Sequence, residues 1–407
     1  MARLRIVARR RLAESTCCPG APRAPEVGEA PRAGRCRSPY APRVPVLHIV
    51  VFVLGMLAVA RTLLSGIRTF ILPRGSSDRL ARLAFHVTRR VFDLAARPGK
   101  PYPVRDRLMA YFGPVSLLIL PVVWLAVITA GYTAMFWAIG VPTPYDAFVD
   151  SGSSLLTLGF ARPSVDYGDV LAFSEAAIGL GLVALLVSYL PTIYAAFSRR
   201  ELYVTLLEVR ADSPPSPIVL LTRLQRLRGL GELGDMWEQW ERWFAELEET
   251  HTSLTVLVHY RSQVPDRSWV NAAGTMMDAA ALTRSAVDIP MDVRADVMIR
   301  AGYLALRRIA DVFALPHPAA PSPDDATSVD RARFEAALDV ISRAGVPVIA
   351  DRARAWRDFT GWRVNYDATL RGLERLTVAP TSWWERPMRS AWATDEPIAE
   401  EAAAHGA

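Results

Sequence analysis

The chain has 407 residues, of which 51% are hydrophobic, and its net charge is +6. Its mean hydropathy is positive, which is high for a soluble globular protein and indicates a membrane protein. Residues 1–44 carry ten Arg against three Glu, so the rest of the chain is close to neutral, which argues against a nucleic-acid-binding protein.

The first 44 residues are predicted to be a disordered tail, because they are rich in Pro and Arg and lack apolar periodicity. All three cysteines (Cys17, Cys18 and Cys36) lie there, so the rest of the chain has no thiol for a disulfide or a metal site. The basic residues are 46 Arg and one Lys, which is typical of a G+C-rich genome, where a start codon is easily assigned too far upstream. We therefore hold as a hypothesis that the tail is not translated.

Three apolar segments follow the tail. Each is long enough to cross a hydrocarbon core of about 30 Å at about 1.5 Å per residue. The first contains Arg61, which lies near its end and can reach the headgroups at modest cost. The segments are Val44–Ile67, Leu108–Tyr145 and Ala176–Ser198.

The distribution of Lys and Arg between the loops predicts the topology. Residues 74–107 contain nine basic residues, whereas residues 141–169 contain only Arg162. Basic loops stay in the cytosol, so the first loop is expected inside, the second outside and the C-terminal part in the cytosol. We thus expect a multi-pass protein of the cell membrane, with the bilayer as its partner. This places the ten-Arg tail outside, so either the tail is not made or the first segment is an interfacial or re-entrant helix.

The outer loop contains "SSLLTLGFARPS", Ser153–Ser164. A bilayer tolerates non-helical backbone only where it is buried in protein or lines water. Potassium filters replace the hydration shell with backbone carbonyls and a Thr hydroxyl, which requires residues tolerant of left-handed backbone at alternate positions. The run Thr157, Leu158, Gly159 and Phe160 fits this pattern. The alternative is a surface turn rich in Gly, Ser and Pro.

The stretch "PYDAFVDSGSSLL" before this run is predicted to form a short pore helix, with Asp146 near its positive end. A rival filter register at "SVDYGD", Ser164–Asp169, is rejected because the next membrane helix would have to start at once. Glu175, early in that helix, has two readings. It either hydrogen-bonds behind the filter or marks the outer membrane interface.

This order of span, pore loop and span resembles bacterial potassium-channel-like membrane proteins. The resemblance rests on "LLTLGF", on Pro163, and on "LAFSEAAIGLGLVALLVSYLPTIYAAFSRRE" with its acidic residue, its glycines and its final Arg pair. It extends to "ETHTSLTVLVHYRSQVPDRSWVNAAGTMMDAAAL", Glu249–Leu282, which is similar to a helical region that accompanies such pores.

The resemblance implies a homotetramer with potassium or another monovalent cation as the permeant ion and no other cofactor. It also implies an ion filter, a pore mouth and an inner-helix hinge. The filter would be formed by Thr157, Leu158, Gly159, Phe160 and Ala161, the mouth by Arg162, and the hinge by Gly179 and Gly181.

Ala161 and Arg162 depart from the family pattern, which has a second glycine and then an acidic residue. A left-handed Ala161 would cost roughly 1–2 kcal/mol, and a ring of four Arg162 side chains would repel cations. These residues argue against potassium selectivity. We expect passive cation conduction, and the alternative is a non-conducting membrane-anchored sensor or scaffold that binds a cytosolic partner.

Residues 199–407 are predicted to be a helical cytosolic domain with Pro-rich breaks at Asp212–Pro217 and Leu315–Asp325. Nucleophile-elbow, HExxH, P-loop and Rossmann patterns are absent, so no enzyme is indicated. "DMWEQWERWFAELEE" places four apolar residues on one core-facing side: Trp237, Trp240, Phe244 and Leu247.

Three further interpretations concern polar residues of this domain. His251 and His259 are eight residues apart and are interpreted as core or surface residues rather than metal ligands. The basic stretch Arg223–Gly234, expected close to the membrane, is a candidate for lipid headgroup contact. Four aspartates are assigned to solvated helix faces: Asp278, Asp288, Asp292 and Asp296.

The predicted fold class is all-α. The sequence predicts a multi-pass α-helical membrane protein with a re-entrant pore loop and a C-terminal helical bundle. Its expected parts are the tail (1–44), a transmembrane channel-like domain (45–198) with the pore loop at 145–164, and the cytosolic domain (199–407).

Overall fold

The structure is a computed structural model that describes residues 46–70, 79–97 and 99–386. The described residues are helical and contain no strand, and one isolated bridge joins Val287 to Val348. The all-α prediction is confirmed for this part of the chain. The tail and its cysteines lie outside the described residues.

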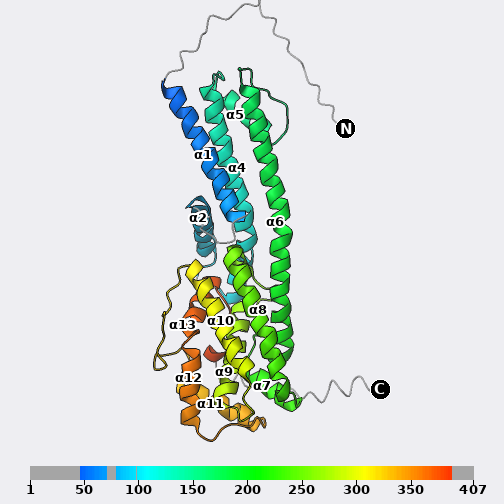
Figure 1. The fold of residues 1–407 in the computed structure, drawn as a ribbon, viewed down its shortest axis with the longest axis vertical. Coiled ribbons are helices and arrows are strands. Elements are labelled where there is room, and N and C mark those ends of the chain that lie inside the picture. Colours follow the sequence, from blue (N-terminus) through cyan, green and yellow to red (C-terminus); the bar gives the residue numbers. More distant parts are fainter. Residues whose placement is uncertain (1–45, 71–78, 98, 387–407) are drawn as a thin grey trace, which may run out of the picture. The chain divides into compact units, whose positions relative to one another are not determined.

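Three long apolar helices follow one another in the chain, namely α1 (Val46–Phe70), α4 (Phe112–Ala138) and α6 (Gly168–Ala211) (Figure 1). Helix α1 packs along α4, and α6 also contacts α4. Among the described residues these are the helices long and apolar enough to cross a membrane, with α3 (Tyr102–Ala110) extending the α4 segment. Each of the three predicted apolar segments thus contains a long helix, but the second helix ends at Ala138, before the predicted end at Tyr145.

A short helix, α5 (Pro144–Leu155), lies between α4 and α6 in the chain and packs against both. Its start is specified by Thr143, whose Oγ accepts a hydrogen bond from the Asp146 N–H at 3.0 Å and donates one to the Asp146 carboxylate at 2.7 Å. Proline at the first helical position suits this cap. The predicted short helix with Asp146 in its first turn is confirmed.

Helix α6 continues for 44 residues, about 66 Å at 1.5 Å per residue. It therefore runs through Ser198, where we expected one domain to end and the next to begin. Arg200 lies within the continuous helix, and its side chain is buried among the C-terminal residues. Its guanidinium donates to the carbonyl oxygens of Leu257 at 2.9 Å and Tyr260 at 2.7 Å. One rod thus leads from the apolar segment into the C-terminal helices.

The remaining helices are α2, which precedes α4, and the C-terminal set. The Pro-rich stretches separate α6 from α7 and α10 from α11, as predicted. The bounds are α2 (Arg79–Ala95), α7 (Pro217–Arg226), η1 (Leu230–Glu232), α8 (Leu233–Ser253), η2 (Thr255–His259), α9 (Trp269–Ala286), α10 (Val293–Val312), α11 (Arg331–Arg343), α12 (Arg352–Arg363), α13 (Asp367–Thr377) and η3 (Trp383–Glu385).

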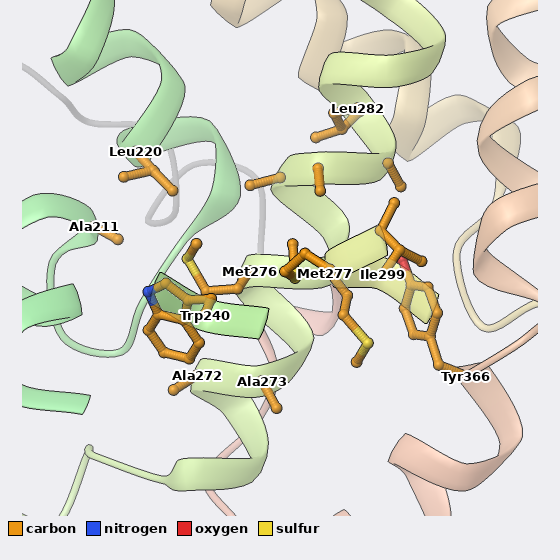
Figure 2. Close-up of a cluster of buried hydrophobic side chains, with 14 of the residues drawn as sticks. Ala211, Leu220, Trp240, Ala272, Ala273, Met276, Met277, Leu282, Ile299 and Tyr366 are labelled. Atoms are coloured by element: carbon orange, nitrogen blue, oxygen red, sulfur yellow. The ribbon is translucent and has the colours of Figure 1, made fainter. Parts of the chain in front are cut away.

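Helix α9 lies at the centre of the C-terminal core and is buried along almost its whole length. Figure 2 shows Met276 and Met277 of α9 between Trp240 of α8 on one side and Ile299 of α10 and Tyr366 on the other. The alanines of α9 let neighbouring helices approach closely. The predicted apolar face of α8 is buried in this core, which confirms its assignment to packing: Trp237, Trp240, Phe244 and Leu247.

Asp278 of α9 is buried, so its assignment to a solvated face was wrong. Its carboxylate pairs with Arg363 and accepts hydrogen bonds from the Tyr366 hydroxyl and the Trp384 indole N–H, each at 2.7 Å. Burial by itself lowers the pKa of Arg363, but the carboxylates of Asp278 and Asp367 outweigh it and raise that pKa. The pair is therefore a charged, fully hydrogen-bonded part of the core.

The expected lipid contact of the stretch Arg223–Gly234 stays a prediction, and the structure places this stretch beyond the end of α6. Helix α6 continues for thirteen residues beyond Ser198, about 20 Å, before the chain turns into α7. Arg223 pairs with Asp212 at 2.6 Å and donates to the carbonyl oxygen of Val209 at 2.8 Å. Its charge is therefore satisfied within the protein, away from the expected membrane boundary.

Candidate functional site

The sequence-predicted filter residues all lie in the loop between α5 and α6, residues 156–167. Thr157 and Gly159 adopt left-handed backbone, with φ of 54° and 71°, and Leu158 between them has negative φ. A β-branched residue in this region costs roughly 1–2 kcal/mol. The strain expected at Ala161 is absent, because Ala161 has negative φ, and it falls on Thr157 instead.

Ser153, in the last turn of α5, holds both ends of this loop. Its carbonyl oxygen accepts a hydrogen bond from the Leu158 N–H at 2.8 Å. Its hydroxyl accepts from the Ala161 N–H at 3.0 Å and donates to the Ala161 carbonyl oxygen at 3.2 Å. The side chain is buried. The sequence analysis did not identify Ser153, because its contacts depend on how the loop folds back on the end of α5.

A second buried contact ties α5 to α6 behind the loop. The Ser151 hydroxyl donates to the Glu175 carboxylate at 2.5 Å and lies 3.3 Å from the Thr129 carbonyl oxygen of α4. Glu175 is fully buried. Of its two readings, the hydrogen bond behind the loop is the one that the structure supports, and Glu175 does not lie at an exposed interface.

The two hinge candidates on α6 have different surroundings. A Cβ added at Gly179 would lie 2.1 Å from the carbonyl oxygen of Leu155, the last residue of α5, whereas nothing lies within 4 Å of a Cβ at Gly181. The absence of a side chain at Gly179 therefore allows α5 to touch α6. The helix is continuous through both glycines, and bending there stays a prediction.

Arg162 forms a two-point contact with Asp169 at the start of α6, with N–O distances of 2.9 and 2.6 Å. These hydrogen bonds raise the pKa of Arg162. Arg162 is therefore not an isolated positive charge, because it is paired with a carboxylate of the same chain. The rejection of the rival register is confirmed, since Gly168 is the first residue of α6.

Three apolar side chains in the first part of the loop are exposed. Leu158 and Phe160 are 60% and 69% exposed, and Leu156 beside them is 56% exposed. The structure thus brings Thr157, Leu158, Gly159, Phe160, Ala161 and Arg162 together in one loop without enclosing them. A single chain therefore covers only one side of these residues.

His251 and His259 are both buried. Of the two interpretations, core or surface, the assignment to the core is therefore correct. The Nε2 atom of His251 lies 3.1 Å from the Arg200 guanidinium, and the ring of His259 packs edge-on against Phe112 of α4 with centroids 4.9 Å apart. Burial, and then the charge of Arg89, lower the pKa of His259 to about 3. No group of three His, Cys, Asp or Glu side chains suited to a metal ion occurs among the described residues.

Within residues 46–70, 79–97 and 99–386 the fold is all-helical, with three helices that are long and apolar enough to cross a membrane. No protein family, curated protein or solved structure matches the chain. The resemblance to potassium-channel-like proteins therefore rests only on the sequence of the loop, of α6 and of the stretch Glu249–Leu282.

Proposed function

We propose that the chain is a subunit of a potassium-channel-like membrane protein and that its α5–α6 loop lines a pathway for monovalent cations. The observation that carries the proposal is the alternation of left-handed Thr157 and Gly159 with a residue of negative φ. Successive carbonyls of an extended strand point to opposite sides, whereas alternating backbone handedness turns them toward one side. A row of carbonyl oxygens on one side is what replaces a cation's hydration shell.

The depth of α5 supports a re-entrant loop. Leu155, at its end, touches Gly179, which lies eleven residues into α6, about 16 Å along the helix axis. Ser151 likewise contacts Thr129, nine residues before the end of α4. Helix α5 therefore lies beside the two long helices instead of beyond their ends. In a bilayer, such backbone has to be covered by protein or to line water.

The exposed apolar residues of the loop support assembly of several copies. Leu158 and Phe160 would be shielded where copies meet, and a homotetramer would place four loops around one axis. In this assembly the basic residues 74–107 and the C-terminal bundle are cytosolic, and the α5–α6 loop opens to the outside.

The Arg162–Asp169 pair bears on the permeant ion. Four such pairs at the mouth add almost no net charge, so the main electrostatic argument against cation entry is weakened. Ala161 still replaces a filter glycine. We therefore propose conduction of monovalent cations with relaxed selectivity, with potassium as the first ion to test.

The test is a flux assay on the full chain in liposomes, with potassium compared against sodium and Gly159→Asp as the blocked reference. Gly159 has open space around it, so the carboxylate would project into the loop region at a strained position. Flux that Gly159→Asp abolishes supports the proposal. Equal background flux from both proteins contradicts it and favours the alternative, a non-conducting anchor whose C-terminal helices bind a partner.

A further inference from the structure

Helix α2 has one face that packs on the protein. Phe85 and Phe92 contact the ring of Phe112, the first residue of α4, with centroid distances of 5.0 and 5.5 Å. Thr88 lies on the same face and is buried. This face is sufficient to hold the helix beside the start of α4.

A second apolar stripe of α2 faces away from the protein. Leu83, Val87, Val91 and Leu94 are 61%, 54%, 59% and 64% exposed. Their spacing of four, four and three residues places them on one side of a helix. A continuous exposed stripe of large apolar side chains is a site for an apolar partner or a membrane surface.

Unpaired positive charge lies at the edge of this stripe, at Arg90, and further round on the polar side, at Arg82. Arg82 and Arg90 are exposed, and no acidic side chain pairs with either among the described residues. The one acidic residue of α2, Asp93, is bound to Arg89 at 2.9 Å. An apolar stripe with cationic edges is the pattern of a helix that lies in a membrane interface with anionic headgroups.

The position of α2 in the chain agrees with this pattern. The helix stands between α1 and α4, two candidate spans, and contacts Phe112 at the end of one of them. It belongs to the segment with nine basic residues that is expected to be cytosolic, and the cytosolic leaflet carries the anionic lipids.

We propose that α2 binds the anionic lipid surface of the cytosolic leaflet through Leu83, Val87, Val91 and Leu94, with Arg82 and Arg90 at the headgroups. A second copy of the chain is a poorer occupant of the same face. Two copies of this stripe would bring arginines together without a carboxylate between them. The inference does not depend on whether the α5–α6 loop conducts ions.

The test uses the full chain with Cys17, Cys18 and Cys36 replaced by Ser and one new cysteine for a fluorescent probe. Val87→Cys reports on the apolar stripe, and His86→Cys, an exposed neighbour on the polar side, is the matched control. The protein is reconstituted into vesicles of phosphatidylcholine with and without phosphatidylserine. Quenching is measured with a nitroxide lipid labelled near the headgroup and with aqueous iodide.

The proposal expects the probe at Val87 to be quenched by the nitroxide lipid and shielded from iodide, with the reverse at His86. Adding phosphatidylserine should increase lipid quenching at Val87. Arg82→Glu and Arg90→Glu should each lower the ratio of lipid-bound to unbound α2, as measured by nitroxide quenching at Val87, by at least about fivefold in those vesicles. Both changes leave the buried face of α2 intact, so the thermal midpoint should not move.

Two results would overturn the inference. Equal access of iodide to both probes would mean that the stripe faces water. Efficient disulfide formation between Val87→Cys copies, without lipid quenching, would mean that a second copy covers the stripe.

Discussion

The hydroxyl of Ser151 on α5 donates a 2.5 Å hydrogen bond to the carboxylate of Glu175 on α6, and both residues are buried. One helical turn further along α6, Gly179 touches the end of α5 at Leu155. These two contacts fix the short helix, and with it the loop of Thr157 and Gly159, to the long helix.

We expect Ser151→Ala to destabilise the protein by about 1–3 kcal/mol, because it leaves a buried carboxyl without its donor. Ser154→Ala is the matched control on the same helix. The Ser154 hydroxyl donates only to the carbonyl oxygen of Asp150 within α5, so its loss should cost little. Thermal unfolding in detergent micelles measures both, and equal shifts would show that the Ser151–Glu175 bond contributes nothing particular.

Gly179→Ala and Gly181→Ala should have opposite effects. The new methyl group at position 179 would overlap the carbonyl oxygen of Leu155 and push α5 away, at a cost of about 1–3 kcal/mol. At position 181 the methyl group meets open space, so alanine should stabilise the helix by about 0.5–1 kcal/mol. The comparison uses unfolding midpoints and, in liposomes, cation flux. A harmless Gly179→Ala would argue against close α5–α6 packing.

Stability should fall at acidic pH through the buried histidines. Burial first, and then the charge of Arg89, hold the pKa of His259 at about 3, below the ordinary value near 6.5 of an unfolded chain. Between these values the unfolded state binds the proton and the folded state does not. The stabilisation is therefore complete above about pH 6.5 and falls by about 1.4 kcal/mol per pH unit below it.

His251 contributes in the same direction, because burial and the charge of Arg200 also lower its pKa. Replacing His259 by Phe, which suits its aromatic neighbours Phe85, Phe112 and Phe313, should reduce the slope of unfolding free energy against pH. His86→Gln, at an exposed position, leaves both buried rings in place and should keep the slope. An unchanged slope in His259→Phe would contradict a neutral, buried His259.

Asp278→Ala should be among the most damaging changes in the C-terminal helices. It removes one of the two carboxylate partners of a buried arginine, and breaking such a pair costs about 3–5 kcal/mol. Asp296→Ala breaks a partly exposed pair with Arg284 in the same core region and should cost about 0–1 kcal/mol. Denaturant unfolding distinguishes the two, and similar losses would indicate that Asp278 is not buried as a charge.

Local patterns were enough to predict much of the fold and of the candidate site. The stretch that starts at Pro144, with Asp146 near its positive end, predicts where α5 begins, and long apolar runs predict the three long helices. The placement of the filter candidates in one loop followed from their order in the chain. Each of these features depends on residues within a few positions of one another.

The features that the sequence could not predict depend on distant partners. Asp278 is paired with residues 85 to 106 positions away, so its helix pattern alone suggested solvent. Arg199 and Arg200 marked an expected membrane boundary, yet Arg200 is accommodated inside the protein by groups more than fifty residues later. The contacts of Ser153 likewise depend on the folded shape of the loop, which the local sequence around Ser153 does not predict.

Because α6 is continuous, it can act as a rigid lever between the loop and the C-terminal helices. From the contact at Gly179 to Ala211, the helix extends for 32 residues, about 48 Å. A tilt of about 5° around that contact would carry Ala211 sideways by about 4 Å, close to the spacing of one helical turn. A small movement of α6 beside the loop would then be coupled to a larger movement among the C-terminal helices. A force applied at either end of α6 would be transmitted to the other end.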